Sequence, residues 1–77
     1  MFLEVFFYNN DMGIGERIKE LRIEHGLSQM QFAKIIGVSQ KAVDYWERGV
    51  NEPKSSYIIA MVKAFEISYD EFFNEVE

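Results

Sequence analysis

Residues 28–49 read SQMQFAKIIGVSQKAVDYWERG, and this stretch contains two short helical patterns separated by one glycine. Ser28 and Gln31 have the spacing of a capping box, which predicts the start of the first helix. Gly37 can adopt the left-handed conformation that a tight turn needs, and Ser39 can cap the second helix. The apolar face of the first helix consists of Phe32, Ala33 and Ile36. Two short helices joined by a turn of three or four residues predict a helix-turn-helix.

Helical patterns also flank this stretch on both sides. Before it, residues at i, i+4, i+7 and i+11 share one helix face, and Gly26 follows them as a possible helix end. These residues are Ile14, Ile18, Leu21 and His25. After Pro53, apolar residues recur at i, i+3, i+4 and i+7, and Ser68 with Glu71 forms a second capping box before Phe72 and Val76. The apolar residues after Pro53 are Ile58, Met61, Val62 and Phe65.

The predicted fold is therefore all-α, with five helices and a short N-terminal extended arm or strand. We assign residues 1–11 to the arm, because they are rich in aromatic and β-branched side chains, and residues 12–77 to the helical domain. A lone strand is marginal in water, so the arm is expected to lie on the helices or to pair with the arm of a second copy. Alternatively, Met12 is the true start of the protein.

Length and composition limit the possible classes of protein. A chain of 77 residues forms one domain, and the absence of Cys excludes a disulfide framework and favours a cytoplasmic location. The first residues lack the basic region of a signal peptide, and no membrane span is expected. The net charge of −5 is unevenly distributed, at −2 over residues 1–27, +1 over residues 28–54 and −4 over residues 55–77. Residues 28–54, which contain the predicted helix-turn-helix, therefore repel a polyanion least.

The chain resembles the Xre/Cro family of phage and bacterial repressors over roughly residues 14–73. The segments that carry the resemblance are Ile14–Arg22, Gly26–Gln29, Phe32–Ala33, Ile36–Ser39, Val43, Trp46–Gly49, Pro53 and Ile67–Phe72. This resemblance implies a lambda-repressor-like domain whose third helix enters the major groove of double-stranded DNA. Residues 1–11 lie outside it.

The resemblance also implies roles for individual positions. Gln29 matches a phosphate-contacting glutamine, and Gln40 and Lys41 match positions that read bases. The expected DNA-binding residues are Gln29, Ser39, Gln40, Lys41, Asp44, Tyr45, Arg48, Asn51 and Lys54. The alternative for these positions is an ordinary solvated helix face. A further family pair, Arg22 with Glu47, would hold the third helix to the body of the domain.

Two features depart from the family pattern. The loop at residues 48–54 carries only two basic residues, opposed by Glu52, where relatives often carry several. Asp44 adds a negative charge to the helix face that would meet DNA. We expect it either to accept a hydrogen bond from a cytosine amine or to pair with Lys41.

The function predicted from these features is a sequence-specific, DNA-binding transcriptional regulator, a repressor acting as a homodimer. The alternative is a protein-interaction module on the same fold, of the antitoxin or antirepressor type. No enzymatic activity, cofactor, metal or small-molecule substrate is expected. His25 is interpreted as a residue near a helix end, and Glu71 with Glu75 as part of a solvated acidic face. The aromatic residues Phe32, Trp46, Phe65 and Phe72 are interpreted as core.

Overall fold

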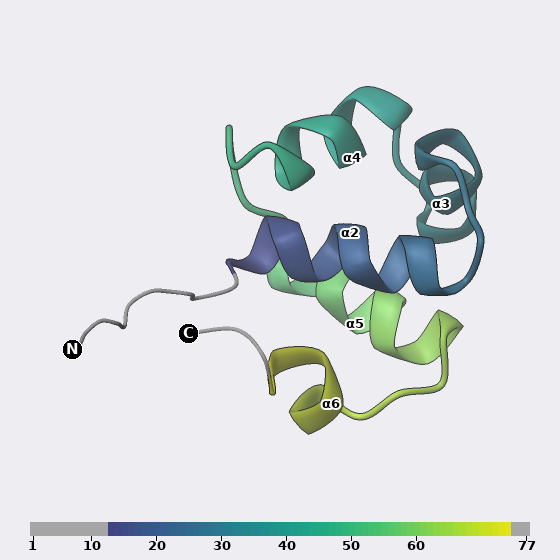
Figure 1. Ribbon diagram of the computed structural model, residues 1–77, viewed down its shortest axis with the longest axis vertical. Helices are drawn as coiled ribbons and strands as arrows, with labels where there is room; N and C mark the ends of the chain where they lie inside the picture. The colour runs from purple at the N-terminus through teal and green to yellow at the C-terminus, as the bar shows by residue number, and fades with distance from the viewer. Residues whose placement is uncertain (1–12, 75–77) are drawn as a thin grey trace, which may run out of the picture.

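The computed structural model describes residues 13–74, and all regular secondary structure within this range is helical. The helices are α2 (Ile14–Glu24), α3 (Gln29–Ile36), α4 (Gln40–Glu47), α5 (Ser55–Ala64) and α6 (Tyr69–Phe73). Figure 1 shows α2 across the middle of the molecule, with α3 and α4 on one side of it and α5 and α6 on the other. The prediction of five helices in an all-α domain is confirmed. The predicted arm at residues 1–11, together with Glu75 and Val76, lies outside the described residues.

The predicted serine caps all form. The Ser28 hydroxyl accepts a hydrogen bond from the Gln31 amide at 3.0 Å, and the Gln31 side chain accepts one from the Ser28 amide at 2.8 Å. Ser68 and Glu71 make the same reciprocal pair at the start of α6. Each box satisfies amide groups that the first turn of a helix leaves without a backbone partner. The starts of α3 and α6 are thus fixed by local sequence.

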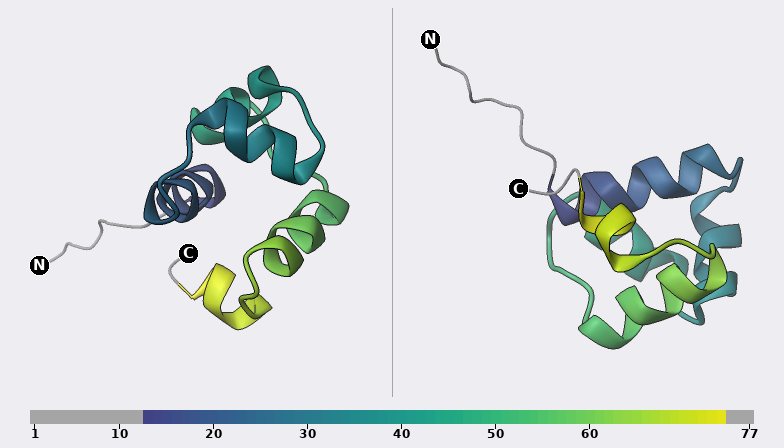
Figure 2. Two further views of the ribbon diagram at one scale, coloured as in Figure 1. Left: turned by 90° about the vertical axis from the view of Figure 1, so that its right-hand side faces the viewer. Right: turned by 90° about the horizontal axis from the view of Figure 1, so that it is seen from below.

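The core is a single cluster to which every helix contributes, and both views in Figure 2 show the helices wrapped around a common centre. Its buried members are Ile18, Leu21, Phe32, Ala33, Ile36, Val43, Trp46, Ile58, Met61, Val62 and Phe72. Phe65 is half-buried and its ring stacks on that of Phe32, with the centroids 5.5 Å apart. The aromatic residues predicted as core therefore pack together, with Phe65 at the edge.

A buried arginine fastens α6 to α2. Arg17 is 8% exposed, and its Nε donates a hydrogen bond to the Phe72 carbonyl oxygen at 2.7 Å. Its Nη2 donates to the Glu71 carbonyl oxygen at 3.1 Å, and its Nη1 pairs with Glu20 at 2.8 Å. The last carbonyl groups of a helix lack backbone partners and carry partial negative charge, so a guanidinium satisfies them well. Arg17 lets a helix of only five residues dock stably.

Candidate nucleic-acid interface

The turn between α3 and α4 has the geometry predicted for it. Gly37 adopts φ 88°, in the left-handed region, and its amide donates to the Ala33 carbonyl oxygen at 2.8 Å. The Val38 amide donates to the same oxygen at 2.9 Å. Ser39 then caps α4 by accepting a hydrogen bond from the Ala42 amide at 3.1 Å. The turn places α4 across the end of α3, and the first residues of α4 are exposed to solvent.

One side of α4 is held rigidly against the body of the domain. Val43 and Trp46 are buried in the core. At Gly15 of α2, a side-chain carbon would lie 2.0 Å from the Trp46 carbonyl oxygen, so only glycine fits there. This close approach lets the backbone of α2 lie directly against the C-terminal end of α4 (Figure 1). No motif or spacing in the sequence predicts this contact.

The predicted pair of Arg22 and Glu47 forms a two-pronged ion pair. Arg22 Nε donates to Glu47 Oε2 at 2.6 Å and Nη2 donates to Oε1 at 3.0 Å, while Nη1 donates to the Leu27 carbonyl oxygen at 2.9 Å. The Glu47 side chain is 5% exposed and that of Arg22 is 13% exposed. The hydrogen bond to Glu47 is the main factor that raises the pKa of Arg22, with burial opposing it. This pair joins α2 to the last residue of α4.

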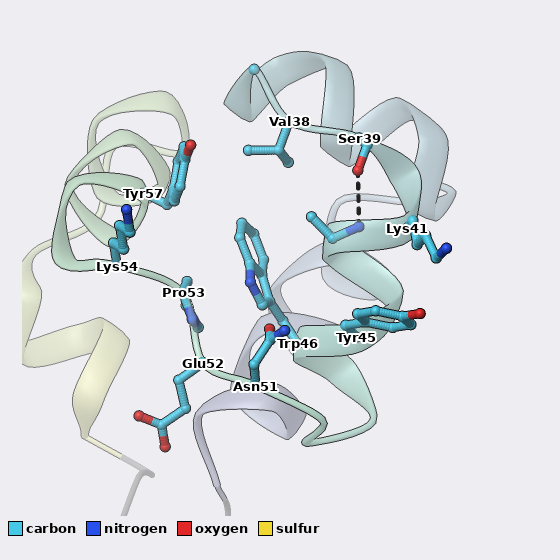
Figure 3. A pocket seen from close by; sticks show the side chains of 12 residues that line it. Val38, Ser39, Lys41, Tyr45, Trp46, Asn51, Glu52, Pro53, Lys54 and Tyr57 are labelled. Carbon is cyan, nitrogen blue, oxygen red and sulfur yellow. Dashed lines mark hydrogen bonds between the residues drawn. The ribbon is translucent and has the colours of Figure 1, made fainter.

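A groove of about 650 Å³ lies between α4, the loop after it and the start of α5 (Figure 3). Val38, Trp46, Pro53 and Tyr57 form its apolar wall, and the rings of Trp46 and Tyr57 are 5.6 Å apart. Five residues of the predicted DNA-binding set line this groove: Ser39, Lys41, Tyr45, Asn51 and Lys54. Side chains that are far apart in the sequence therefore meet at one surface.

Three more of the predicted residues form a polar network beside the groove. Gln29 Nε2 donates to Asp44 Oδ1 at 3.3 Å and to Glu47 Oε1 at 3.2 Å. Arg48 Nε donates to Asp44 Oδ2 at 3.0 Å. The side-chain amide nitrogen of Gln29 has two hydrogens, so it can donate to both carboxylates of α4 at once. Gln29, the first residue of α3, thereby links α3 to α4, and its spacing from Asp44 and Glu47 in the sequence does not predict these contacts.

The expected pairing of Asp44 with Lys41 is wrong. Asp44 is neutralised by Arg48 one turn later, while the Lys41 ammonium lies over the ring of Tyr45. An arginine at i+4 from an aspartate is well placed for this contact, and its fork can reach the carboxylate while the rest of the guanidinium stays exposed. The hydrogen bonds from Gln29 and then from Arg48 hold the pKa of Asp44 below its ordinary value.

Gln40 completes the predicted set. It is the first residue of α4 and is exposed.

His25 follows the last residue of α2, with Nδ1 2.9 Å from the Leu21 carbonyl oxygen. Within residues 13–74, no group of three His, Asp or Glu side chains is placed to hold a metal ion. None of the helices in that range is long and apolar enough to cross a membrane.

Comparison with known proteins agrees with this geometry. A family model described as helix-turn-helix matches residues 18–72. The chain belongs to this helix-turn-helix family. Among its relatives, the antitoxin PezA of Streptococcus pneumoniae is 34% identical, over 83% of this chain and 44% of that protein. The repressor protein C2 of Salmonella phage P22 is 36% identical, over 79% of this chain and 28% of that protein. The chain thus spans less than half the length of either relative.

A solved helix-turn-helix protein has the same fold. The P22 c2 repressor, in a crystal structure with a synthetic operator, superposes with a TM-score of 0.70 at 34% identity. The match covers 79% of this chain and 92% of that chain. The predicted lambda-repressor-like arrangement is confirmed, and the resemblance to Xre/Cro regulators is confirmed with it.

Proposed function

We propose that this helix-turn-helix domain binds double-stranded DNA sequence-specifically and regulates transcription as a repressor, with α4 as the element that reads the major groove. The observation that carries the proposal is the division of α4 into two sides. One side is fixed by Trp46, Glu47 and the contact with Gly15, while the other side presents polar side chains to solvent. A helix that must read bases has to be both exposed and rigidly oriented.

The residues on the exposed side have suitable chemistry. Gln40 lies in the first turn of α4, where an amide can bond bidentately to adenine, and Lys41 beside it can donate to guanine. Lys54 lines the groove beside α4 and supplies positive charge to a phosphate there, and Arg48, which follows the last residue of α4, can donate to a phosphate oxygen. The pairing of Asp44 with Arg48 removes the negative charge that would otherwise oppose DNA.

We infer that two copies act together on a two-fold operator in the cytoplasm. One small domain offers few base and phosphate contacts, so a second copy is needed for useful specificity. Half-site centres would then lie about 10 bp apart, or a multiple of that distance. Because Asp44 offsets the charge of Arg48, Lys41 and Lys54 supply the net positive charge of this surface in each copy, and log K should fall with log salt with a slope of about −4.

Selection of binding sites from random duplex DNA tests this function directly. We expect a two-fold site from the wild-type protein, and each of Gln40→Ala and Lys41→Ala should relax the preference at one base pair at a cost of about 1–3 kcal/mol. Lys63→Ala is the matched control for Lys41→Ala, because Lys63 carries the same charge and is exposed in the last turn of α5, whereas the groove lies at the start of that helix. Unchanged profiles for both α4 variants would contradict the assignment of α4 as the reading helix.

A second candidate function is that of an antitoxin-type module that binds a protein partner. It is favoured by the similarity to the antitoxin PezA and by the charge of −4 over residues 55–77. A protein that binds only another protein would not be retained on heparin and would not shift a duplex in a salt-dependent manner. Retention on heparin together with a salt-dependent shift would favour the regulator.

A further inference from the structure

The ring of Tyr45, a half-buried residue of α4, lies close to two cations. The Lys41 ammonium is 5.7 Å from the centroid of the Tyr45 ring, and the Arg48 guanidinium carbon is 5.4 Å from the same centroid. Positions 41, 45 and 48 follow one another at i, i+4 and i+7, so they form a single stripe along the helix. Figure 3 shows Lys41 and Tyr45 together on the outer side of α4, with Trp46 on the opposite side facing Tyr57.

The two cations differ in what else holds them. Arg48 also donates to Asp44, whereas in the part of the chain that the structure describes no ion pair engages Lys41. A cation within about 6 Å of an aromatic ring is attracted to the negative face of that ring. Both cations lie within that distance of the Tyr45 ring, so the ring attracts each of them and restricts where their side chains lie.

We infer that Tyr45 is a positioning residue for DNA binding, whose ring holds Lys41 and Arg48 in place so that both cations are presented together to the acceptor oxygens of the duplex. This inference rests on the proposed function. It gives Tyr45 a role other than the direct contact with DNA that was expected for it. Ordering two flexible side chains before the partner arrives removes an entropic penalty that binding would otherwise include.

The arrangement can be tested without DNA. The ring current of Tyr45 should shift the side-chain methylene protons of Lys41 upfield in an NMR spectrum of the free protein. Tyr45→Phe keeps a ring and should keep the shift, whereas Tyr45→Leu should abolish it. Tyr45 is outside the core, so the amide spectrum and melting temperature should be preserved in both variants. Absence of the shift from the wild-type protein would overturn the inference while leaving the proposed function intact.

Binding to the duplex selected by the wild-type protein then tests the role. Tyr45→Leu should raise Kd by about 5- to 30-fold, the effect of losing two exposed cation–π contacts, and Tyr45→Phe should change it less than about twofold. In a protein that already carries Lys41→Ala and Arg48→Ala, measured at low salt, Tyr45→Leu should have almost no further effect. Tyr69→Leu, at an exposed position of α6, is the matched control variant.

The outcomes separate the possible explanations. An equal loss from Tyr45→Leu in both backgrounds would mean that the ring touches DNA itself, and a loss from Tyr45→Phe would assign the role to the hydroxyl. Either result would overturn the positioning role. A wild-type protein that selects no duplex would overturn the proposed function and this role with it, which the NMR result on Lys41 would not do.

Discussion

Removal of one partner of the Arg22–Glu47 pair should destabilise the domain severely. In Arg22→Met, Glu47 loses both guanidinium hydrogen bonds and keeps only the one from Gln29, at a site where its side chain is 5% exposed. The Leu27 carbonyl oxygen loses its guanidinium donor as well. A carboxylate left unpaired in such a site costs about 3–5 kcal/mol. In Glu47→Leu, Arg22 is the charge left without a partner. Arg22 keeps its hydrogen bond to the Leu27 carbonyl oxygen, and its side chain is more exposed to water than that of Glu47.

The size of this effect is best judged against the total stability. A chain of 77 residues has a free energy of unfolding on the order of 4–12 kcal/mol, so Arg22→Met should remove from about a quarter of that free energy to all of it. Arg22→Lys, which keeps the charge but loses the fork, should be milder at about 1–2 kcal/mol. The double variant Arg22→Met with Glu47→Leu should cost about 2–3 kcal/mol less than the sum of its single changes.

Urea unfolding can measure this cycle with an internal probe. The single tryptophan, Trp46, is buried and lies next to Glu47 in the chain, so its fluorescence should report loss of α4 packing. Circular dichroism on the same samples checks that helix and tryptophan signals change together, as two-state analysis requires. Single changes that each cost less than about 1 kcal/mol and add without coupling would refute the reasoning, because they would place the pair among ordinary surface contacts.

Three further predictions concern other contacts of the domain. Gly15→Ala should destabilise by at least about 1–3 kcal/mol, although alanine normally favours a helix, because the added carbon would meet the Trp46 carbonyl oxygen; Gly13→Ala has open space and should be tolerated in the same thermal melt. Arg17→Met should cost about 2–4 kcal/mol and should speed amide exchange in α6 ahead of the other helices, and exchange that rises equally everywhere would contradict the fastening role. Asp44 should titrate below its ordinary pKa in NMR. The stability that its contacts contribute should be fully present above the unfolded pKa near 3.9 and should be lost as pH falls through the lower pKa of the folded protein. Gln29→Ala should raise the pKa of Asp44, and an unchanged pKa would show that the hydrogen bond from Gln29 is not formed.

The parts of the fold that local sequence could predict are those in which neighbours in the chain act on one another. The serine caps and the turn at Gly37 are of this kind, since each depends on residues within about four positions. The periodicity of apolar residues likewise predicted which side of each helix is buried. In α4, Trp46 was predicted as core, and it is buried together with Val43, while Gln40 and Lys41 are exposed.

The contacts that were missed join residues far apart in the chain. Arg17 meets the carbonyl groups of α6 across more than fifty residues, and Gln29 meets Asp44 across fifteen. Their side chains are ordinary for an exposed helix, so spacing alone gives no sign of the partner. Asp44 shows the same difficulty at short range, because Lys41 and Arg48 both lie within helical reach of it. Only the geometry decides that Lys41 lies over Tyr45 instead.

Under the proposed function, the division of α4 into a fixed side and a free side makes sequence preference a replaceable property of this domain. Positions 40, 41 and 45 take no part in the buried cluster, so residues grafted there from another regulator could retarget the domain without rebuilding its interior. Positions 44 and 48 are less independent, since both belong to the network that includes Gln29. A change at position 44 or 48 would therefore have to be matched within that network, and a change at position 41 or 45 would disturb the contacts of the Tyr45 ring with Lys41 and Arg48. Position 40 belongs to neither set of contacts, and the domain would tolerate new operators most readily through it.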